Sequence, residues 1–160
     1  NLVDTKHGVP MNRERIKKIV KEHMMVSNDF LSLSGEIIEL SEKMANALSN
    51  GNKVILFGNG GSAADCQHIA AELSGKFYRE NRPGLAAISL TTNSSSLTAI
   101  GNDFGFSEVF SRQLEGLACK GDIVIGISTS GESPNVVEGI RKANELNYQI
   151  QLVLGSNSYI

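Results

Sequence analysis

Short apolar runs and helix-like segments alternate along the chain from residue 53 onward, and this alternation constrains the fold more than any other feature. Strand-like runs lie at 53–57, 85–90, 122–128 and 149–155, and helix-like segments lie at 62–74, 94–105, 106–118 and 134–147. The run DIVIGIS at 122–128 is continuously apolar, as expected for a strand that is buried on both faces. The sequence therefore predicts an α/β domain in which helices cover both faces of a doubly wound parallel sheet.

The segment before residue 53 has a helical pattern instead. Apolar residues such as Ile16, Ile19 and Val20 recur at three- and four-residue spacings between Met11 and Asn50. Serines between 27 and 34 predict a break between two helices. We expect residues 1–10 to be a tag or a disordered lead and 11–160 to form a single domain. Periodicity leaves open whether the helices cover this domain's own sheet or a neighbouring subunit.

The composition of the chain argues against two classes of binding partner, nucleic acids and membranes. Fifteen Lys and Arg stand against 17 Asp and Glu, so the net charge of -2 predicts no nucleic-acid partner. No apolar run approaches the ~20 residues that span a bilayer, which predicts no membrane partner. Cys66 and Cys119 do not form a C-x-x-C pair, and we expect them to be reduced thiols of a cytoplasmic protein.

Two polar loops follow predicted strands, and ligands of open α/β sheets bind at such strand ends. The first, the glycine loop GNGGSAAD (58–65), lets the backbone approach a ligand and offers the N–H groups of a helix start at Ser62 to an anion. It lacks the lysine of a nucleotide P-loop, and Ala63 stands where G-x-G-x-x-G requires a third glycine. It therefore predicts a phosphate site outside the nucleotide-binding motifs.

The second loop, the hydroxyl loop STSGES (128–133), precedes a helix with Pro134 in its first turn. Its hydroxyls belong to Ser128, Thr129, Ser130 and Ser133. Ser and Thr are also ordinary helix N-caps, so this loop alone is explained equally well by capping. Both loops together, at strand ends of one sheet, favour a phosphate or sugar-phosphate site.

His68 and Glu72 lie four residues apart on the helix that follows the glycine loop, so they share one helix face. Such a pair can ligate a metal or supply a base, and it can equally be a surface ion pair or a buried hydrogen bond. At 1.5 Å rise per residue these turns lie ~5–10 Å beyond the proposed anion, the length of a phosphorylated sugar. This position favours a role toward the sugar.

Several stretches together make a family resemblance recognisable. They are GNGGSAADCQHIAAELSG, NRPGLAAISL, AIGNDFGF, VFSRQLE and GDIVIGISTSGESPNV. Over residues 12–155 the chain resembles the phosphoheptose isomerases of the sugar isomerase (SIS) domain superfamily. The hydroxyl loop alone would indicate only a SIS domain, whereas H-x-x-x-E, GNDFGF and FSRQ in this order are more specific.

The resemblance implies a flavodoxin-like three-layer α/β/α sandwich with a parallel sheet, preceded by helices that build a homotetramer. It implies conversion of sedoheptulose 7-phosphate to D-glycero-D-manno-heptose 7-phosphate, the first step toward activated heptose for lipopolysaccharide or capsule. The implied substrate contacts are Asn59, Gly60, Gly61, Ser62, Glu72, Asn102, Asp103, Ser128, Thr129, Ser130 and Ser133, of which the last four hold the phosphate. The implied zinc ligands are His68 and Glu72, with one ion per subunit and Glu72 also the catalytic acid–base.

The sequence departs from the family in one respect. The family carries a later helix whose glutamine and histidine complete the metal site, whereas the histidines here are His7, His23 and His68. We expect that the family's C-terminal strand and helix are missing through truncation or dropped segments.

Two other functions remain open. One is a non-catalytic SIS-domain binding protein, either an adaptor for a replication initiator or a sugar-phosphate sensor. The other is an isomerase of a different sugar phosphate, because the loops do not specify the number of carbons. The His68–Glu72 pair favours an enzyme, since an adaptor has no need to keep a metal ligand beside a base.

Overall fold

The computed structural model describes residues 12–76, 78, 81–146 and 148–154, so the tag or lead expected at 1–10 lies outside the described residues. Two compact units form, the first ending at Ser41 and the second beginning at Glu42. None of the helices in the described ranges combines the length and the apolarity needed to cross a membrane. The site described below lies wholly within the second unit.

The first unit contains α1 (Arg13–Asp29), η1 (Phe30–Leu33) and the start of α2 (Ser34–Ser49). The Asn12 side chain accepts a hydrogen bond from the Arg15 N–H at 2.9 Å and so caps α1. The break at η1 confirms the one predicted from the serines. There the hydroxyls of Ser32 and Ser34 donate to backbone carbonyls three residues earlier, which competes with regular helix geometry.

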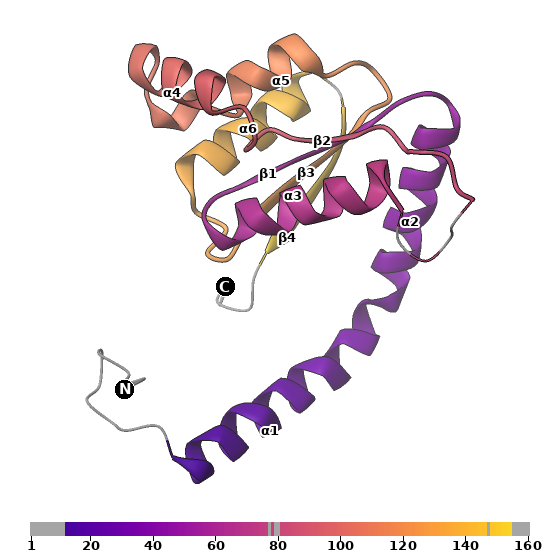
Figure 1. Cartoon of the computed structure of the whole chain (residues 1–160), viewed down its shortest axis with the longest axis vertical. Helices are drawn as coiled ribbons and strands as arrows, with labels where there is room; N and C mark the ends of the chain where they lie inside the picture. The colour runs from indigo at the N-terminus through magenta and orange to yellow at the C-terminus, as the bar shows by residue number, and fades with distance from the viewer. Residues whose placement is uncertain (1–11, 77, 79–80, 147, 155–160) are drawn as a thin grey trace. The chain divides into compact units, whose positions relative to one another are not determined.

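Four parallel strands form the sheet, in the order β2-β1-β3-β4, and confirm the predicted parallel sheet (Figure 1). They are β1 (Val54–Gly58), β2 (Ala87–Ser89), β3 (Ile123–Ser128) and β4 (Gln149–Leu154). After β1 the chain passes to one side of that strand to form β2 and then to the other side to form β3. This reversal is the topological switch point of a doubly wound sheet, where ligands bind.

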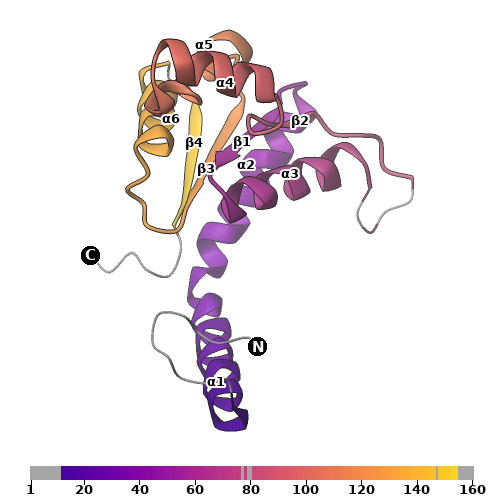
Figure 2. The same ribbon diagram turned by 60° about the vertical axis from the view of Figure 1, so that its left-hand side comes forward.

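Side chains that alternate along β1 fill two separate cores. Val54 and Leu56 pack in one core with α3 (Gly61–Ser74) and the last turns of α2, together with Cys66 and Ala47. Ile55 and Phe57 pack in the other core, against helices from later in the chain. These helices are α4 (Ser94–Asp103), α5 (Ser111–Leu117) and α6 (Pro134–Glu145). Helices therefore lie on both sides of the sheet, as Figure 2 shows, and the predicted three-layer sandwich is confirmed.

The segment 106–118 was predicted as one helix and is instead divided. The 3-10 turn η2 (Phe106–Glu108) and α5 are separated by Val109 and Phe110, both buried. The Phe110 ring stacks on Phe57 with ring centroids 5.0 Å apart, so core packing interrupts the local helical preference.

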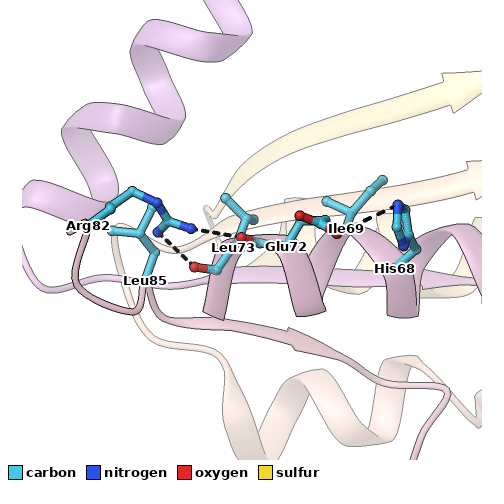
Figure 3. A pocket seen from close by; sticks show the side chains of 6 residues that line it. All are labelled: His68, Ile69, Glu72, Leu73, Arg82 and Leu85. Carbon is cyan, nitrogen blue, oxygen red and sulfur yellow. Dashed lines mark hydrogen bonds and ion pairs between the residues drawn. The ribbon is translucent and has the colours of Figure 1, made fainter. Parts of the chain in front are cut away.

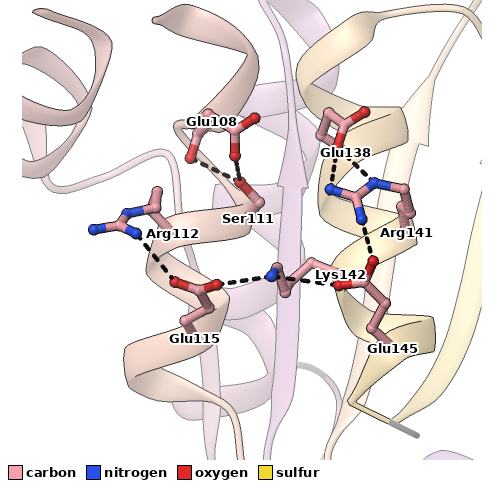
Figure 4. A network of polar contacts seen from close by, with 8 residues as sticks. All are labelled: Glu108, Ser111, Arg112, Glu115, Glu138, Arg141, Lys142 and Glu145. Atoms are coloured by element: carbon pink, nitrogen blue, oxygen red, sulfur yellow. Dashed lines mark hydrogen bonds and ion pairs between the residues drawn. The ribbon is translucent and has the colours of Figure 1, made fainter. Parts of the chain in front are cut away.

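Charged side chains connect α5 to α6, two of the helices that pack around Ile55 and Phe57 (Figure 4). Lys142 Nζ on α6 lies 2.7 Å from Glu115 on α5 and 3.4 Å from Glu145. Arg141 pairs with Glu138 and with Glu145 along α6. Because these groups are exposed to solvent, each pair contributes little to stability.

A buried ion pair links the amino-terminal ends of β1 and β3. The Asp122 side chain is 1% exposed and lies 2.7 Å from Lys53 Nζ. Asp122 also accepts hydrogen bonds from the backbone N–H groups of Cys119 and Lys53, at 2.7 and 3.0 Å. Beside it, Asn52 donates to the Lys120 carbonyl at 3.0 Å and links the two segments that lead into these strands.

Cys66 lies in the core on α3, whereas Cys119 is exposed. Burial of the Cys66 thiol, with a smaller effect of the nearby Asp65 carboxylate, raises its pKa to about 12. The thiol therefore stays protonated and unreactive at neutral pH.

Candidate functional site

The carboxyl ends of β1 and β3 lie side by side at the switch point, with Gly58 in register with Ile127. The glycine loop leaves β1 and enters α3, and the hydroxyl loop leaves β3 and enters α6. Two helix N-termini therefore begin next to each other at this edge. Their amide groups and helix dipoles make the edge favourable for an anion.

Glycine is required at the point where β1 turns into α3. A Cβ atom added at Gly58 would lie 2.7 Å from the Ile127 carbonyl oxygen and 2.9 Å from Ser62 Cβ. Gly60, the N-cap of α3, has a φ of +54°. These two positions allow α3 to begin directly against β3. Gly60 and Gly61 are exposed there, and Ser62 is buried in the first turn.

The hydroxyl loop folds on its own side chains. Ser128 is 3% exposed. Its Oγ accepts a hydrogen bond from the Gly131 N–H at 3.0 Å and lies 3.2 Å from Ser133 Oγ. Ser130 Oγ accepts from the Glu132 N–H at 3.2 Å. Thr129 and Ser130 are exposed on the loop, while Ser128 and Ser133 shape it from beneath. The four hydroxyls predicted to hold a phosphate thus belong to one compact turn.

A pair of amide side chains connects the two loops. Asn59 Nδ2 donates to Asn135 Oδ1 and Asn135 Nδ2 donates to Asn59 Oδ1, each at 2.8 Å. The family resemblance implies that Asn59 contacts substrate, whereas Asn135 is not among the predicted site residues. The sequence does contain a signal that Asn135 is buried: Asn135, Gly139 and Ala143 lie four residues apart, and they form part of the buried face of α6.

His68 and Glu72 lie on one face of α3, with His68 Nε2 4.0 Å from Glu72 Oε1 (Figure 3). The side chains are 73% and 34% exposed, respectively. Both line a cavity of about 340 Å³. The other residues that line it are Ile69, Leu73, Arg82 and Leu85. The two groups predicted for chemistry are therefore open to a ligand.

Arg82 holds the last turns of α3 in place. Its guanidinium donates to the backbone carbonyls of Glu72 and Leu73, at 2.7 and 2.8 Å (Figure 3). It also donates to the Gly75 carbonyl at 3.2 Å. A cation at a helix C-terminus satisfies carbonyls that have no partner within the helix. Because one of these carbonyls belongs to Glu72, Arg82 also stabilises the backbone that carries the Glu72 carboxylate.

An imidazole nitrogen and a carboxylate oxygen are both good zinc ligands, so His68 and Glu72 fit as two members of a zinc site. Protein zinc sites usually have four ligands, of which a catalytic site leaves one to water or substrate. Within the described ranges, no group of three or more His, Cys, Asp and Glu could hold a metal ion. Further ligands would have to come from residues outside those ranges or from another subunit.

The predicted substrate residues Asn102 and Asp103 lie at the end of α4 and are exposed. Asn102 Nδ2 donates to Asp103 Oδ1 at 2.8 Å. Among the described residues, no hydrogen bond joins the Asn102 or Asp103 side chain to either of the two loops. The structure therefore brings together the loops and α3, but it does not link Asn102 and Asp103 to them.

Comparisons with known proteins extend over most of the chain. A family model for the SIS domain matches residues 16–154. Phosphoheptose isomerase of Aquifex aeolicus is 52% identical over 145 residues, covering 90% of this chain and 75% of that protein. Phosphoheptose isomerase of Campylobacter jejuni (strain 81116) is 52% identical over 132 residues, covering 82% and 70%.

Solved structures with a similar fold are phosphoheptose isomerases as well. Phosphoheptose isomerase from Neisseria gonorrhoeae superposes with a TM-score of 0.83 at 40% identity, covering 91% of this chain and 77% of that one. A phosphoheptose isomerase from Francisella tularensis gives a TM-score of 0.87 at 30% identity, covering 94% and 79%.

Proposed function

This chain belongs to the phosphoheptose isomerase family of SIS domain proteins, and we propose that it converts sedoheptulose 7-phosphate to D-glycero-D-manno-heptose 7-phosphate. Membership makes it a sugar-phosphate isomerase, and the identity of the sugar is the proposal. The names of the relatives support this sugar, and one observation of the structure supports the isomerisation chemistry. The helix α3 begins at the sheet edge where two helix N-termini favour an anion, and its face that bears His68 and Glu72 lines a cavity.

Glu72 is the base in this proposal. In the ketose-to-aldose direction, its carboxylate removes a proton from C1, the electron pair forms the C1–C2 double bond of an enediol, and the C2 oxygen is protonated. The proton then returns to C2, and loss of the O1 proton leaves the aldehyde. The hydroxyl loop and the two helix N-termini bind the phosphate, which positions C1 and C2 along α3.

We also propose zinc as the cofactor, held in part by His68 and Glu72. A bound zinc ion would act as a Lewis acid that stabilises negative charge on the reacting oxygens. The imidazole and carboxylate donor atoms, close together on one helix face, support this assignment.

Turnover of sedoheptulose 7-phosphate by the full gene product, with zinc added and with chelator, tests the function. We expect conversion with zinc, reduced about 100-fold or more by chelator and restored by zinc, since Lewis-acid stabilisation contributes several kcal/mol. Conversion at an unchanged rate in chelator would contradict the zinc assignment alone. Binding of the sugar phosphate without conversion would favour a sugar-phosphate sensor, and conversion of only another sugar phosphate would correct the substrate.

We further propose that four copies associate through the first unit. The described residues of α1 include no buried side chain, and its apolar residues Ile16, Ile19, Val20 and Met24 are exposed at helical spacing. Such a face is stabilised by burial against another copy. Sedimentation velocity should give the mass of four chains, and Ile19→Glu should lower it. Lys21→Glu, on the polar side of the same helix, is the matched control. A monomeric wild-type protein would contradict the proposal.

A further inference from the structure

The amide pair between the two loops is built from residues that are far apart in the chain. Asn59 follows β1 and Asn135 is in the first turn of α6, 76 positions later. Asn135 is only 2% exposed, so its polar side chain lies where an apolar one would normally pack. Burial of an amide is tolerated when its hydrogen bonds are made, and here both its nitrogen and its oxygen are used.

The hydrogen bonds fix the orientation of both side chains. Each amide donates to the other and accepts from it, so rotating either one by half a turn would bring like groups together. Asn135 Oδ1 also accepts from the Val136 N–H at 3.0 Å, which ties the pair to the backbone of α6. Asn59 is tied in turn to α3, because its carbonyl accepts from the Ala63 N–H at 3.3 Å.

We propose that Asn135 is a positioning residue for the isomerase: it holds the hydroxyl loop and the glycine loop at one fixed separation. This inference rests on the proposed function. A phosphate bound at the hydroxyl loop would then lie at a set distance from the start of α3. Glu72 lies on that helix, so the same separation decides whether C1 and C2 of the sugar reach its carboxylate. Asn135 acts through Asn59 and does not itself contact the substrate.

Kinetics of Asn135→Ala test the inference. We expect kcat/KM for sedoheptulose 7-phosphate to fall about 10- to 100-fold with KM raised, because small misplacements of bound groups have effects of that size. Inorganic phosphate, used as a competitive inhibitor, should bind more weakly to the variant. Asn59→Ala removes the same connection together with an expected substrate contact, so its loss should be at least as large, and the double variant should be no worse than Asn59→Ala alone.

Asn52→Ala is the matched control. Asn52 links the same two strands at their other ends through the Lys120 carbonyl. Its loss should lower thermal stability and leave KM unchanged. If Asn135→Ala lowers thermal stability while KM, kcat and phosphate inhibition stay at wild-type values, Asn135 is only structural and the inference is wrong.

A second variant and a second measurement test the inference if Asn135→Ala does not fold or if the wild type is inactive. Should Asn135→Ala fail to fold, Asn135→Asp keeps the shape and the acceptor for Asn59 Nδ2 but opposes an oxygen to Asn59 Oδ1, so KM should still rise. Wild-type turnover reports separately on the proposed function. If the wild type binds the sugar phosphate without converting it, calorimetric affinities of wild type and Asn135→Ala replace KM. If it neither binds nor converts it, both proposals fail.

Discussion

Replacing Glu72 with glutamine should abolish detectable turnover of sedoheptulose 7-phosphate while the protein stays folded. The substitution keeps the shape of the side chain and removes its ability to accept a proton. Loss of general acid–base catalysis alone lowers rates by about 100- to 10,000-fold, and loss of a metal ligand would add to this. The backbone of Glu72 remains held by Arg82, so circular dichroism and the melting temperature should match those of the wild type.

Glu145→Gln is the control for this experiment. Glu145 lies at the end of α6, whereas the hydroxyl loop lies at the start of that helix, so the same chemical change there should leave kcat and KM unaltered. Turnover by Glu72→Gln within a factor of a few of the wild-type rate would reject Glu72 as the base. Loss of activity together with loss of circular dichroism would show a structural role instead.

Asp122→Asn should give the largest loss of stability among single charge substitutions of the second unit. It breaks a buried pair and turns an acceptor of two backbone N–H groups into a partial donor. Breaking such a pair costs about 3–5 kcal/mol when both partners are buried. The Lys53 side chain is 28% exposed, so we expect a loss at the lower end, about 3 kcal/mol. Urea unfolding at fixed protein concentration measures the difference in free energy of unfolding.

Glu115→Gln provides the matched comparison. Glu115 and Lys142 lie at the same 2.7 Å separation as Asp122 and Lys53, but both are more accessible than Asp122. We expect a clearly smaller loss there than in Asp122→Asn, because solvent screens an exposed pair. Equal losses in the two variants would show that burial and the backbone hydrogen bonds of Asp122 contribute nothing beyond the ion pair.

The Asp122 contribution should also depend on pH. Burial acts to raise the pKa of the Asp122 carboxyl, but hydrogen bonds from Lys53 Nζ and from the backbone of Cys119 and Lys53 outweigh it, and the net pKa is lowered. The stabilisation is therefore fully present above the unfolded-state pKa of 3.8 and is lost as pH falls through the lower folded-state pKa. The difference between wild type and Asp122→Asn should be constant near neutral pH and shrink below about pH 4.

Local pattern was sufficient for most of the secondary structure. The strands β1, β3 and β4 and the helices α3 and α6 were predicted nearly to their observed bounds, because apolar periodicity, glycines and Pro134 act within a few residues. The strand β2 covers only Ala87–Ser89 of the predicted 85–90. The division of 106–118 was not predictable in the same way. It depends on Phe110 stacking on Phe57, 53 positions earlier in the chain, and no local propensity reports such a contact.

The candidate site also combines features set by local sequence with features set by the tertiary fold. Local sequence is enough to predict which chemical groups are available: a glycine loop, a run of hydroxyls, and a histidine and a glutamate on one helix face. Each of these features is set by residues a few positions apart. Which of these groups lie close together depends on the tertiary fold. Strand order places β1 beside β3, and this brings Asn59 to Asn135 across 76 positions. Contacts at that separation depend on how the whole sheet is assembled, and a single sequence carries no local signal for it.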